Sequence, residues 1–302
     1  MMEIPFKRPE LEDRQEILSC LKGQGLRGCE RTFANIYLWA RFYNLVWAKV
    51  EGTVVFRSEF NRKHSYTYPT GNGDRKAAVE RLLEEGRKQE YPFQFHGLSK
   101  GEYEELERNF PGRFEITWPR DVEDYVYETE KLIRLSGKKY HGKKNHINQF
   151  KAAHPDWSYE PLTDDNVEEC FQMALRWREF NGCEGDPEKN KEMCVALNSL
   201  RLQKELELRG GVLRAGGEVV AFTLGEPVSE DTFVVHIEKA YSDIRGAYPM
   251  INQQFLEHEV SQYLYVNRED DTGEEGLRKA KLSYHPVFMV EKGTAVLRGE
   301  SV

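Results

Sequence analysis

Hydrophobic positions in the first half of the chain recur with helical spacing in some stretches and alternate in others. A run of aromatic residues at helical spacing predicts a buried helix, and the alternating stretch after it predicts a hairpin that turns at Glu51-Gly52. A later helical stretch pairs acids with bases four residues apart, as expected of a solvent-exposed helix. Together these patterns predict helices over 9–24, 32–44 and 73–89, the hairpin over 45–60 and a strand within 114–127.

The second half repeats this kind of order. Residues 210–241 carry turn signals at Gly216-Gly217 and near Glu230-Asp231, which predicts three strands in an antiparallel meander. Two helices precede the meander, and a helix, a strand, another helix and a terminal strand pair follow it. Such an order predicts an α+β layered domain. The ranges are 163–182 and 186–208 for the first two helices, 248–262 for the third and 286–298 for the terminal pair.

Length and composition fit two such domains. A chain of 302 residues corresponds to two domains of about 150 residues each, expected here at 1–150 and 151–302. A hydrophobic fraction of 39% and a charged fraction of 31% are typical of globular proteins. The formal charge of −8 argues against a protein that coats nucleic acid, but it is compatible with a local basic groove.

The sequence contains no recognisable signal peptide, membrane helix or cysteine motif. The N-terminal residues are too charged for a signal peptide, and no window approaches the roughly 18 consecutive apolar residues of a membrane helix. The five cysteines form no CxxC and match neither a zinc site nor a disulfide framework. We therefore expect a cytoplasmic protein with reduced thiols, no metal and no transmembrane segment.

One stretch departs from the acidic character of the chain. From Lys131 to Lys151 there are seven Lys or Arg, two His and no Asp or Glu. Clustered lysines favour phosphate because each cation neutralises one anion and releases a counterion. A solvated linker face is the alternative, although surface helices normally mix the two signs. The predicted anion contacts are Lys138, Lys139, Lys143 and Lys144.

Two long motifs resemble a known family. The stretches YVYETEKLIRLSGKKYHGKKNHINQF and VNREDDTGEEGLRKAKLSYHPV are similar to the C-terminal domain of phosphatidylglycerol lysyltransferases and their soluble stand-alone relatives. This resemblance covers most of the chain. It implies two tandem GNAT-like (acyl-CoA N-acyltransferase) domains with mixed or antiparallel central sheets flanked by helices, the first a degenerate copy. It also implies that the basic window lies at the junction of the two halves and faces the cleft.

The resemblance further implies transfer of an amino acid from aminoacyl-tRNA to an amine or hydroxyl. The membrane-spanning half of the lysyltransferases has no counterpart in the sequence, so the acceptor stays open between a small molecule and a lipid headgroup. The donor, an aminoacyl-tRNA or another phosphate-bearing molecule, is expected in the interdomain cleft.

The predicted strand DTFVVHIEKAY offers a candidate base. His236 and Glu238 point to one face of it. Together they can accept a proton from an attacking amine, and the resemblance supports this because GNAT-type enzymes often use an acid on this strand. The alternative is a core histidine satisfied by the glutamate. Neither residue has further ligands at metal-binding spacing.

The segment 266–286 carries the densest set of candidate residues. Pro286 ends its helix and fixes the direction of Tyr284, and the resemblance implies that Tyr284 protonates the leaving group. The cations around it are expected to depress the pKa of such a tyrosine or of a nearby base. A solvent-exposed helix with ion pairs four residues apart is the alternative. The predicted phosphate or carboxylate contacts are Asn267, Arg268, Lys279, Lys281 and His285.

A glycine turn precedes the predicted helix 248–262. The GNAT pyrophosphate turn reads Q/R-x-x-G-x-G/A, but in SDIRGAYPMIN the residue three before Gly246 is Asp243. The match is poor, and an ordinary Gly-Pro helix start is the alternative. Arg245 is the candidate phosphate contact of this turn. Acyl-CoA is therefore the weaker of the two donors, and no other cofactor is predicted.

Two functions from different classes follow. The first is a transferase that moves an aminoacyl or acyl group from aminoacyl-tRNA or acyl-CoA to an amine or hydroxyl acceptor. It would work chiefly by positioning donor and acceptor and by stabilising a tetrahedral oxyanion. The second is a non-catalytic module that binds RNA or a phosphorylated metabolite on a GNAT-like scaffold, since a fold alone does not guarantee catalysis.

Overall fold

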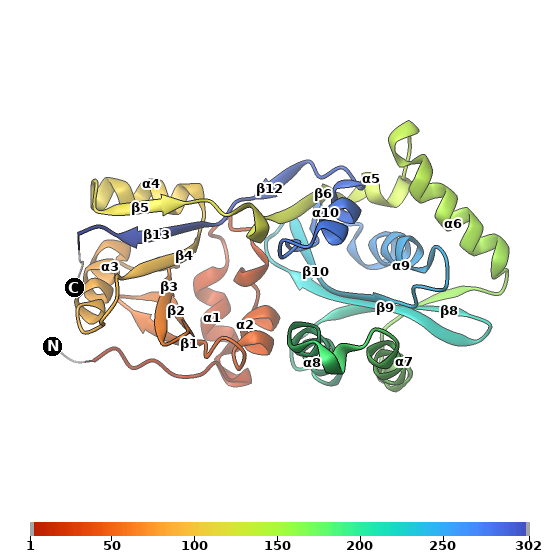
Figure 1. Ribbon diagram of the computed structural model, residues 1–302, viewed down its shortest axis with the longest axis horizontal. Helices are drawn as coiled ribbons and strands as arrows, with labels where there is room; N and C mark the ends of the chain where they lie inside the picture. Colours follow the sequence, from red (N-terminus) through yellow and green to blue (C-terminus); the bar gives the residue numbers. More distant parts are fainter. Residues whose placement is uncertain (1–2, 300–302) are drawn as a thin grey trace. The chain divides into compact units, whose positions relative to one another are not determined.

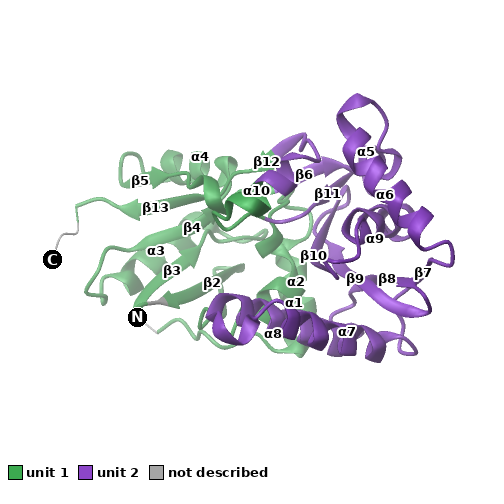
Figure 2. Cartoon of the chain, turned by 45° about the vertical axis from the view of Figure 1, so that its right-hand side comes forward, with its two compact units in different colours: residues 1–124, 270–278, 289–302 green, residues 125–269, 279–288 purple. Residues whose placement is uncertain are grey.

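The computed structural model describes residues 3–299, which divide into two units, each built around a β-sheet (Figures 1 and 2). Unit 1 consists of Met1–Asp124, Asp270–Arg278 and Met289–Val302, and unit 2 of Tyr125–Glu269 and Lys279–Phe288. This division differs from the boundary expected at residue 150. Both units have sheets flanked by helices, so the predicted α+β class is confirmed. No helix of the described chain combines the length and apolarity that crossing a membrane requires.

Unit 1 contains a six-stranded sheet in the order β1-β2-β3-β4-β13-β5. Its helices are α1 (Arg14–Leu21), α2 (Phe33–Trp39), α3 (Arg75–Gly86) and α4 (Lys100–Asn109), with a short 3-10 helix η2 (Cys29–Arg31) before α2. Its strands are β1 (Val46–Val50), β2 (Thr53–Phe60), β3 (Lys63–Thr67), β4 (Gln94–Leu98), β5 (Phe114–Thr117) and β13 (Gly293–Leu297).

Local sequence signals explain these elements. The predicted hairpin turn is confirmed, since Glu51 and Gly52 both have positive φ and connect β1 to β2. Helix α4 begins with a capping box in which Ser99 and Glu102 each bond the other's backbone N–H. The core of the unit packs aromatic strand residues such as Tyr66 and Phe95 against the apolar faces of α3 and α4.

The rest of the chain contains a seven-stranded sheet in the order β12-β6-β11-β10-β9-β8-β7. The helices are α5 (Thr129–Arg134), a 3-10 helix η4 (Lys138–Tyr140), α6 (His141–Ala153), α7 (Val167–Phe180), α8 (Pro187–Arg201), α9 (Ala247–Phe255), a π-helical turn (Leu256–Val260) and α10 (Glu275–Leu282). The strands are β6 (Asp124–Glu128), β7 (Ser158–Pro161), β8 (Arg209–Ala215), β9 (Glu218–Pro227), β10 (Thr232–Ala240), β11 (Tyr265–Asn267) and β12 (Phe288–Val290).

The predicted meander is confirmed as β8, β9 and β10, with Gly216 and Gly217 both at positive φ in the first turn. Helices cover both faces of it: α9 lies on one side, and α7 and α8 lie on the other (Figure 1). Strand β11 then pairs in parallel with β10, and β6 pairs antiparallel with β11. Strand β6 thus comes from a distant part of the sequence to lie beside the consecutive strands β10 and β11.

The two sheets share one plan in which a strand from elsewhere is inserted. In unit 1 a meander β1-β2-β3 is followed by the parallel strand β4, and β13 lies between β4 and β5. In the other sheet β8-β9-β10 is followed by the parallel strand β11, and β6 lies between β11 and β12. Strand β6 follows the strands β1 to β5 in the sequence but belongs to the second sheet. Strand β13 follows the strands of the second sheet but belongs to the first. This corrects the prediction of a terminal strand pair, because β12 and β13 belong to different sheets.

Candidate functional site

A cluster of polar and aromatic side chains forms where β10, β11 and β6 run side by side in unit 2. Glu238 lies on β10, Arg268 directly follows β11, and Tyr127 lies on β6. The backbone N–H of Arg268 donates to the carbonyl of Tyr125 at 3.0 Å, which extends the pairing of β11 with β6 by one residue. The sheet therefore holds the backbone from which the Arg268 guanidinium projects.

Arg268 is the centre of this cluster. Its Nη2 donates to Glu238 Oε1 at 2.7 Å, and both side chains are 13% exposed. The second carboxylate oxygen of Glu238 accepts from Asn252 Nδ2 of α9 at 2.9 Å. Glu238 is thus held on both oxygens and orients the guanidinium. Nη1 of Arg268 is buried, and no atom of the described residues accepts a hydrogen bond from it.

Tyr284, just after α10, packs against this guanidinium. Its ring centroid lies 4.8 Å from Arg268 Cζ and 6.3 Å from the ring of Tyr127, which meets it edge-on. Burial raises the pKa of Tyr284 to about 12, although the charge of Arg268 acts in the opposite direction. The prediction that nearby cations depress the pKa of this tyrosine is therefore wrong, because desolvation outweighs them. The phenol keeps its proton at neutral pH.

Lys143 of α6 also packs against the ring of Tyr284. Its Nζ lies 4.0 Å from the ring centroid of Tyr284. Burial, followed by the charge of Arg268, lowers the pKa of Lys143 to about 8, while Glu238 opposes the change. An amine with such a pKa exists in both protonation states near neutral pH, so Lys143 is able to accept or donate a proton there.

Two strained residues flank the cluster. Glu269 and His285 follow Arg268 and Tyr284, and both have positive φ, at 57° and 55°. Residues other than glycine adopt this conformation at a cost, and such strain concentrates at functional sites. In both cases it turns the chain immediately after a residue of the cluster.

His236 does not join Glu238, contrary to the predicted pair. It lies at a register shift in the pairing of β10 with β9 and contacts two other acids, Glu226 at 3.2 Å and Glu269 at 2.7 Å. Burial would lower the pKa of His236, but its hydrogen bonds to Glu226 and Glu269 outweigh this and raise it to about 10. A histidine that stays protonated at neutral pH has no lone pair to act as a base. We therefore assign His236 no catalytic role.

The other predicted contacts divide into structural and exposed residues. Lys281 donates to the backbone carbonyl of Arg268 at 2.6 Å, and the buried Asn267 accepts from the N–H of Glu269 at 2.7 Å, so both support the loop that carries Arg268. His285 lies against Tyr140 and the Lys139 carbonyl, with an exposed ring. The remaining predicted residues are exposed: Lys138, Lys139, Lys144, Lys279 and Arg245.

Sequence reasoning missed two members of the cluster and misplaced its setting. Tyr127 is within the motif YVYETE that carries the family resemblance, and its hydroxyl donates to the carbonyl of Lys281 at 2.9 Å. Asn252 had no local signal beyond its place on a helix. We expected the site along a seam between two halves, but all the contacts described above lie within unit 2.

The glycine turn before α9 is poorly suited to a pyrophosphate. The N–H of Ala247 already donates to the carbonyl of Ile244 at 3.1 Å, and Pro249 has no N–H to offer. Gly246 has a φ of 90°, and a Cβ there would lie 2.3 Å from the His146 carbonyl of α6. The turn is thus packed against α6. The structure therefore agrees with the poor match of this sequence to the GNAT pyrophosphate turn.

One group among the described residues has the type and spacing of metal ligands, and it lies in unit 1. Ligand atoms of Cys29, Glu30 and Asp124 are within 4.8 Å of one another. However, the Lys292 ammonium lies 2.6 Å from Asp124 Oδ1 and 2.9 Å from Glu30 Oε2. Because this cation already neutralises the same oxygens, the group does not favour a metal ion at neutral pH.

Comparison with known proteins identifies the family. The sequence profile of the family described as phosphatidylglycerol lysyltransferase, C-terminal, matches residues 24–295. A conserved protein of unknown function from Bacteroides thetaiotaomicron VPI-5482 is 39% identical, and its crystal structure covers 98% of this chain and 100% of its own with a TM-score of 0.93.

Two further solved structures have the same fold at low sequence identity. The C-terminal domain of a candidate lysylphosphatidylglycerol synthetase from Agrobacterium fabrum is 15% identical, with 96% of this chain and 91% of that chain covered and a TM-score of 0.67. L-PGS from Bacillus licheniformis is also 15% identical, with 99% and 96% covered and a TM-score of 0.67. The chain therefore belongs to the family of phosphatidylglycerol lysyltransferase C-terminal domains.

Proposed function

We propose that this protein transfers an aminoacyl group from an aminoacyl-tRNA to an amine or hydroxyl acceptor, with the reaction centred on Arg268, Tyr284 and Lys143. The family, together with solved structures of the same fold, supports a GNAT-like aminoacyltransferase domain. The names of the family and of the Agrobacterium fabrum relative specify a lysyl group, which makes lysine the first aminoacyl group to test.

The observation that carries this proposal is the buried Nη1 of Arg268, which has no acceptor among the described residues. A buried donor left unpaired costs about 1–3 kcal/mol. Acyl transfer creates an oxyanion at the ester carbonyl, and preorganised buried donors stabilise that charge most effectively in a water-poor site. Glu238 keeps the guanidinium in place, so Nη1 is the hydrogen-bond donor for the developing oxyanion.

The other two groups move protons. Lys143, in its neutral form, takes the proton from the acceptor as it attacks the ester carbon, since its lowered pKa lies near working pH. Tyr284 holds its proton at neutral pH and donates it to the ribose oxygen when the ester bond breaks. This division reassigns Lys143, which the sequence placed among phosphate contacts, and replaces His236 as the base.

Two features favour tRNA over acyl-CoA as the donor. At the turn before α9 the N–H of Ala247 is already bonded and Pro249 has none, whereas a GNAT-type CoA site depends on free N–H groups there. In contrast, Lys138, Lys139 and Lys144 are exposed on η4 and α6, next to Lys143. Exposed cations beside a reaction centre suit the phosphates of an RNA acceptor end.

Tyr284→Phe is expected to lower aminoacyl transfer by about a hundredfold or more, because loss of a general acid typically costs this much. The measurement is transfer of labelled lysine from lysyl-tRNA to a panel of amines, alcohols and phosphatidylglycerol, with spontaneous hydrolysis subtracted. Tyr159→Phe is the matched control. Tyr159 lies in the same unit, and its buried hydroxyl has no hydrogen-bond partner among the described residues. Absence of transfer from every aminoacyl-tRNA tested, with retained RNA binding, would instead support the non-catalytic binding module.

The pH profile tests the role of Lys143. If neutral Lys143 is the base, kcat/KM rises about tenfold per pH unit below the pKa of about 8 and levels off above it. Lys143→Met should be slow and lose this inflection, while the exposed neighbour Lys144→Met should keep it. A wild-type rate that falls through pH 8 would mean that the ammonium form is required, and the assignment of Lys143 as a base would be wrong.

A further inference from the structure

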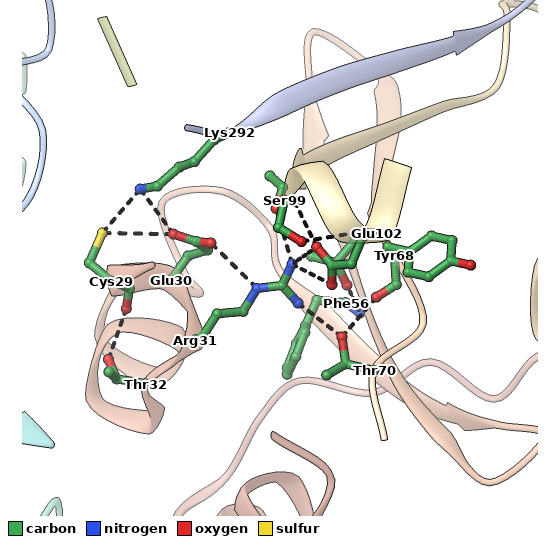
Figure 3. A network of polar contacts seen from close by, with 12 residues as sticks. Cys29, Glu30, Arg31, Thr32, Phe56, Tyr68, Thr70, Ser99, Glu102 and Lys292 are labelled. Carbon is green, nitrogen blue, oxygen red and sulfur yellow. Dashed lines mark hydrogen bonds and ion pairs between the residues drawn. The ribbon is translucent and has the colours of Figure 1, made fainter. Parts of the chain in front are cut away.

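A second reactive cluster lies in unit 1, and the proposed transfer reaction does not use it. Lys292 Nζ contacts Asp124 Oδ1 at 2.6 Å, Glu30 Oε2 at 2.9 Å and Cys29 Sγ at 3.4 Å. Figure 3 shows the lysine side chain extending toward both Cys29 and Glu30. Cys29 and Glu30 belong to η2, whereas Lys292 directly precedes β13. The cluster therefore joins segments from opposite ends of the sequence.

Burial restricts the reactions open to the sulfur. Cys29 is 7% exposed and Lys292 is 8% exposed, so a large thiol such as glutathione has little access to either. Hydrogen peroxide is far smaller, so the same burial restricts its access less. No disulfide joins any two of the described cysteines. An oxidised Cys29 sulfur thus has the Lys292 amine as a nucleophile in van der Waals contact.

The two carboxylates supply the proton acceptor that such a reaction needs. Asp124 Oδ1 lies 2.6 Å from Lys292 Nζ and 3.5 Å from Cys29 Sγ, and Asp124 Oδ2 accepts from the backbone N–H of Cys29 at 2.8 Å. Asp124 is therefore fixed between amine and sulfur. It is placed to take a proton from the ammonium without any rearrangement of the backbone.

We propose that Cys29 and Lys292 form a covalent sulfur–nitrogen bridge when the protein meets peroxide. In the first step the Cys29 sulfur attacks one peroxide oxygen, an S–O bond forms, the O–O bond breaks, and a sulfenic acid and one water result. In the second step Asp124 takes one proton from the Lys292 ammonium, and the nitrogen attacks the sulfur. The S–N bond forms, the S–O bond breaks, and the hydroxide leaves as water with the second ammonium proton.

The bridge connects residues that are 263 positions apart in the sequence. Cross-links across long loops restrict the unfolded chain and so stabilise the folded state. Lys292 directly precedes β13, which lies between β4 and β5 in the sheet of unit 1. The bridge therefore links the start of this strand covalently to the N-terminal segment. We therefore expect bridging to raise the thermal unfolding midpoint of the chain.

The test is peptide mass mapping of the folded protein after peroxide treatment and alkylation of the remaining thiols. Trypsin should release the peptide 28–31 joined to 282–298, uncleaved at Lys292, with a mass lower by two hydrogens than the sum of the two peptides. Dithiothreitol should separate them. The same joined pair heavier by one oxygen also demonstrates the bridge, because a second peroxide that oxidises the bridged sulfur adds an S–O bond, releases water and leaves the S–N bond in place.

Two controls use the same chain. Protein unfolded in guanidinium before peroxide treatment should not form the joined peptide, since only the fold brings Cys29 to Lys292. Cys29→Ser, which keeps a small polar side chain, should lose both the joined peptide and the gain in unfolding midpoint, whereas Cys20→Ser should keep them. Burial would lower the pKa of Lys292, but the charge of Asp124 and then Cys29 and Glu30 hold it well above its usual value. Bridging should therefore be faster at higher pH.

The proposal is overturned if trypsin cleaves normally after Lys292 in peroxide-treated folded protein. Cys29 would then be found either as sulfinic or sulfonic acid, or as an unreacted thiol that the alkylating reagent has modified. Failure of the bridge leaves the proposed transferase function untouched, because neither residue belongs to the cluster around Arg268.

Discussion

Arg268→Gln lowers the rate of aminoacyl transfer by about a hundredfold to a thousandfold, the usual cost of removing one oxyanion donor. The loss should fall on kcat more than on KM, because Nη1 has no acceptor until the oxyanion forms. The measurement is steady-state transfer with the aminoacyl-tRNA donor and the acceptor identified for the wild type.

A stability effect must be separated from this loss. The substitution leaves Glu238 largely buried without its cation, and breaking such a pair from one side costs about 3–5 kcal/mol. The double variant Arg268→Gln, Glu238→Gln removes both charges and should recover most of the stability while it stays inactive. A folded double variant with wild-type activity would contradict the role of the guanidinium.

Lys292→Met should destabilise the chain by about 3–5 kcal/mol, because it removes the cation from a buried cluster. Asp124 is completely buried and Lys292 is 8% exposed, so water does not replace the lost ion pairs. Denaturant unfolding, followed by tryptophan fluorescence, measures the effect. Asp124→Asn added to Lys292→Met removes one of the unpaired charges and should restore part of the stability.

An exposed pair provides the matched control. Lys100 and Glu291 form an ion pair with side chains 64% and 38% exposed, in the same unit. Lys100→Met should change the free energy of unfolding by less than about 1 kcal/mol. If the two lysine variants are equally stable, the buried cluster does not stabilise unit 1.

The acid range gives an independent check on the same cluster. Burial would raise the pKa of Glu30, but the charges of Lys292 and Arg31 lower it to about 2 from an ordinary value of 4.5. Its contribution to stability is therefore complete above about pH 4.5 and is lost as the pH falls toward 2. Lys292→Met should reduce this acid dependence.

The candidate site was predictable in its residue types and only partly in its arrangement. Arg268, Tyr284 and Glu238 were identified from motif resemblance and strand position, and the structure brings them together. His236 has the same alternation along its strand, but a register shift and two neighbouring acids place it in a different ion cluster. Strand periodicity reports which face a side chain occupies, and it does not report which distant loop supplies its partners.

The pKa values show the same limit. From the sequence, several nearby cations predicted a depressed pKa for Tyr284, yet its burial raises that pKa to about 12. The same burial lowers the pKa of Lys143 to about 8. The charged residues near a group can be listed from the sequence. The effect of desolvation on its pKa depends on how the folded chain packs around it.

The sequence by itself determined the local elements of this protein. The Glu51-Gly52 and Gly216-Gly217 turns, the meander and the α+β class follow from turn residues and periodicity, which act over a few neighbouring positions. Only the tertiary structure decided that β6 and β13 each complete the sheet of the other half. Strand pairing is set by which edge is available in space, and two halves with similar strand order offer similar edges, so no local signal in either strand specifies its partner.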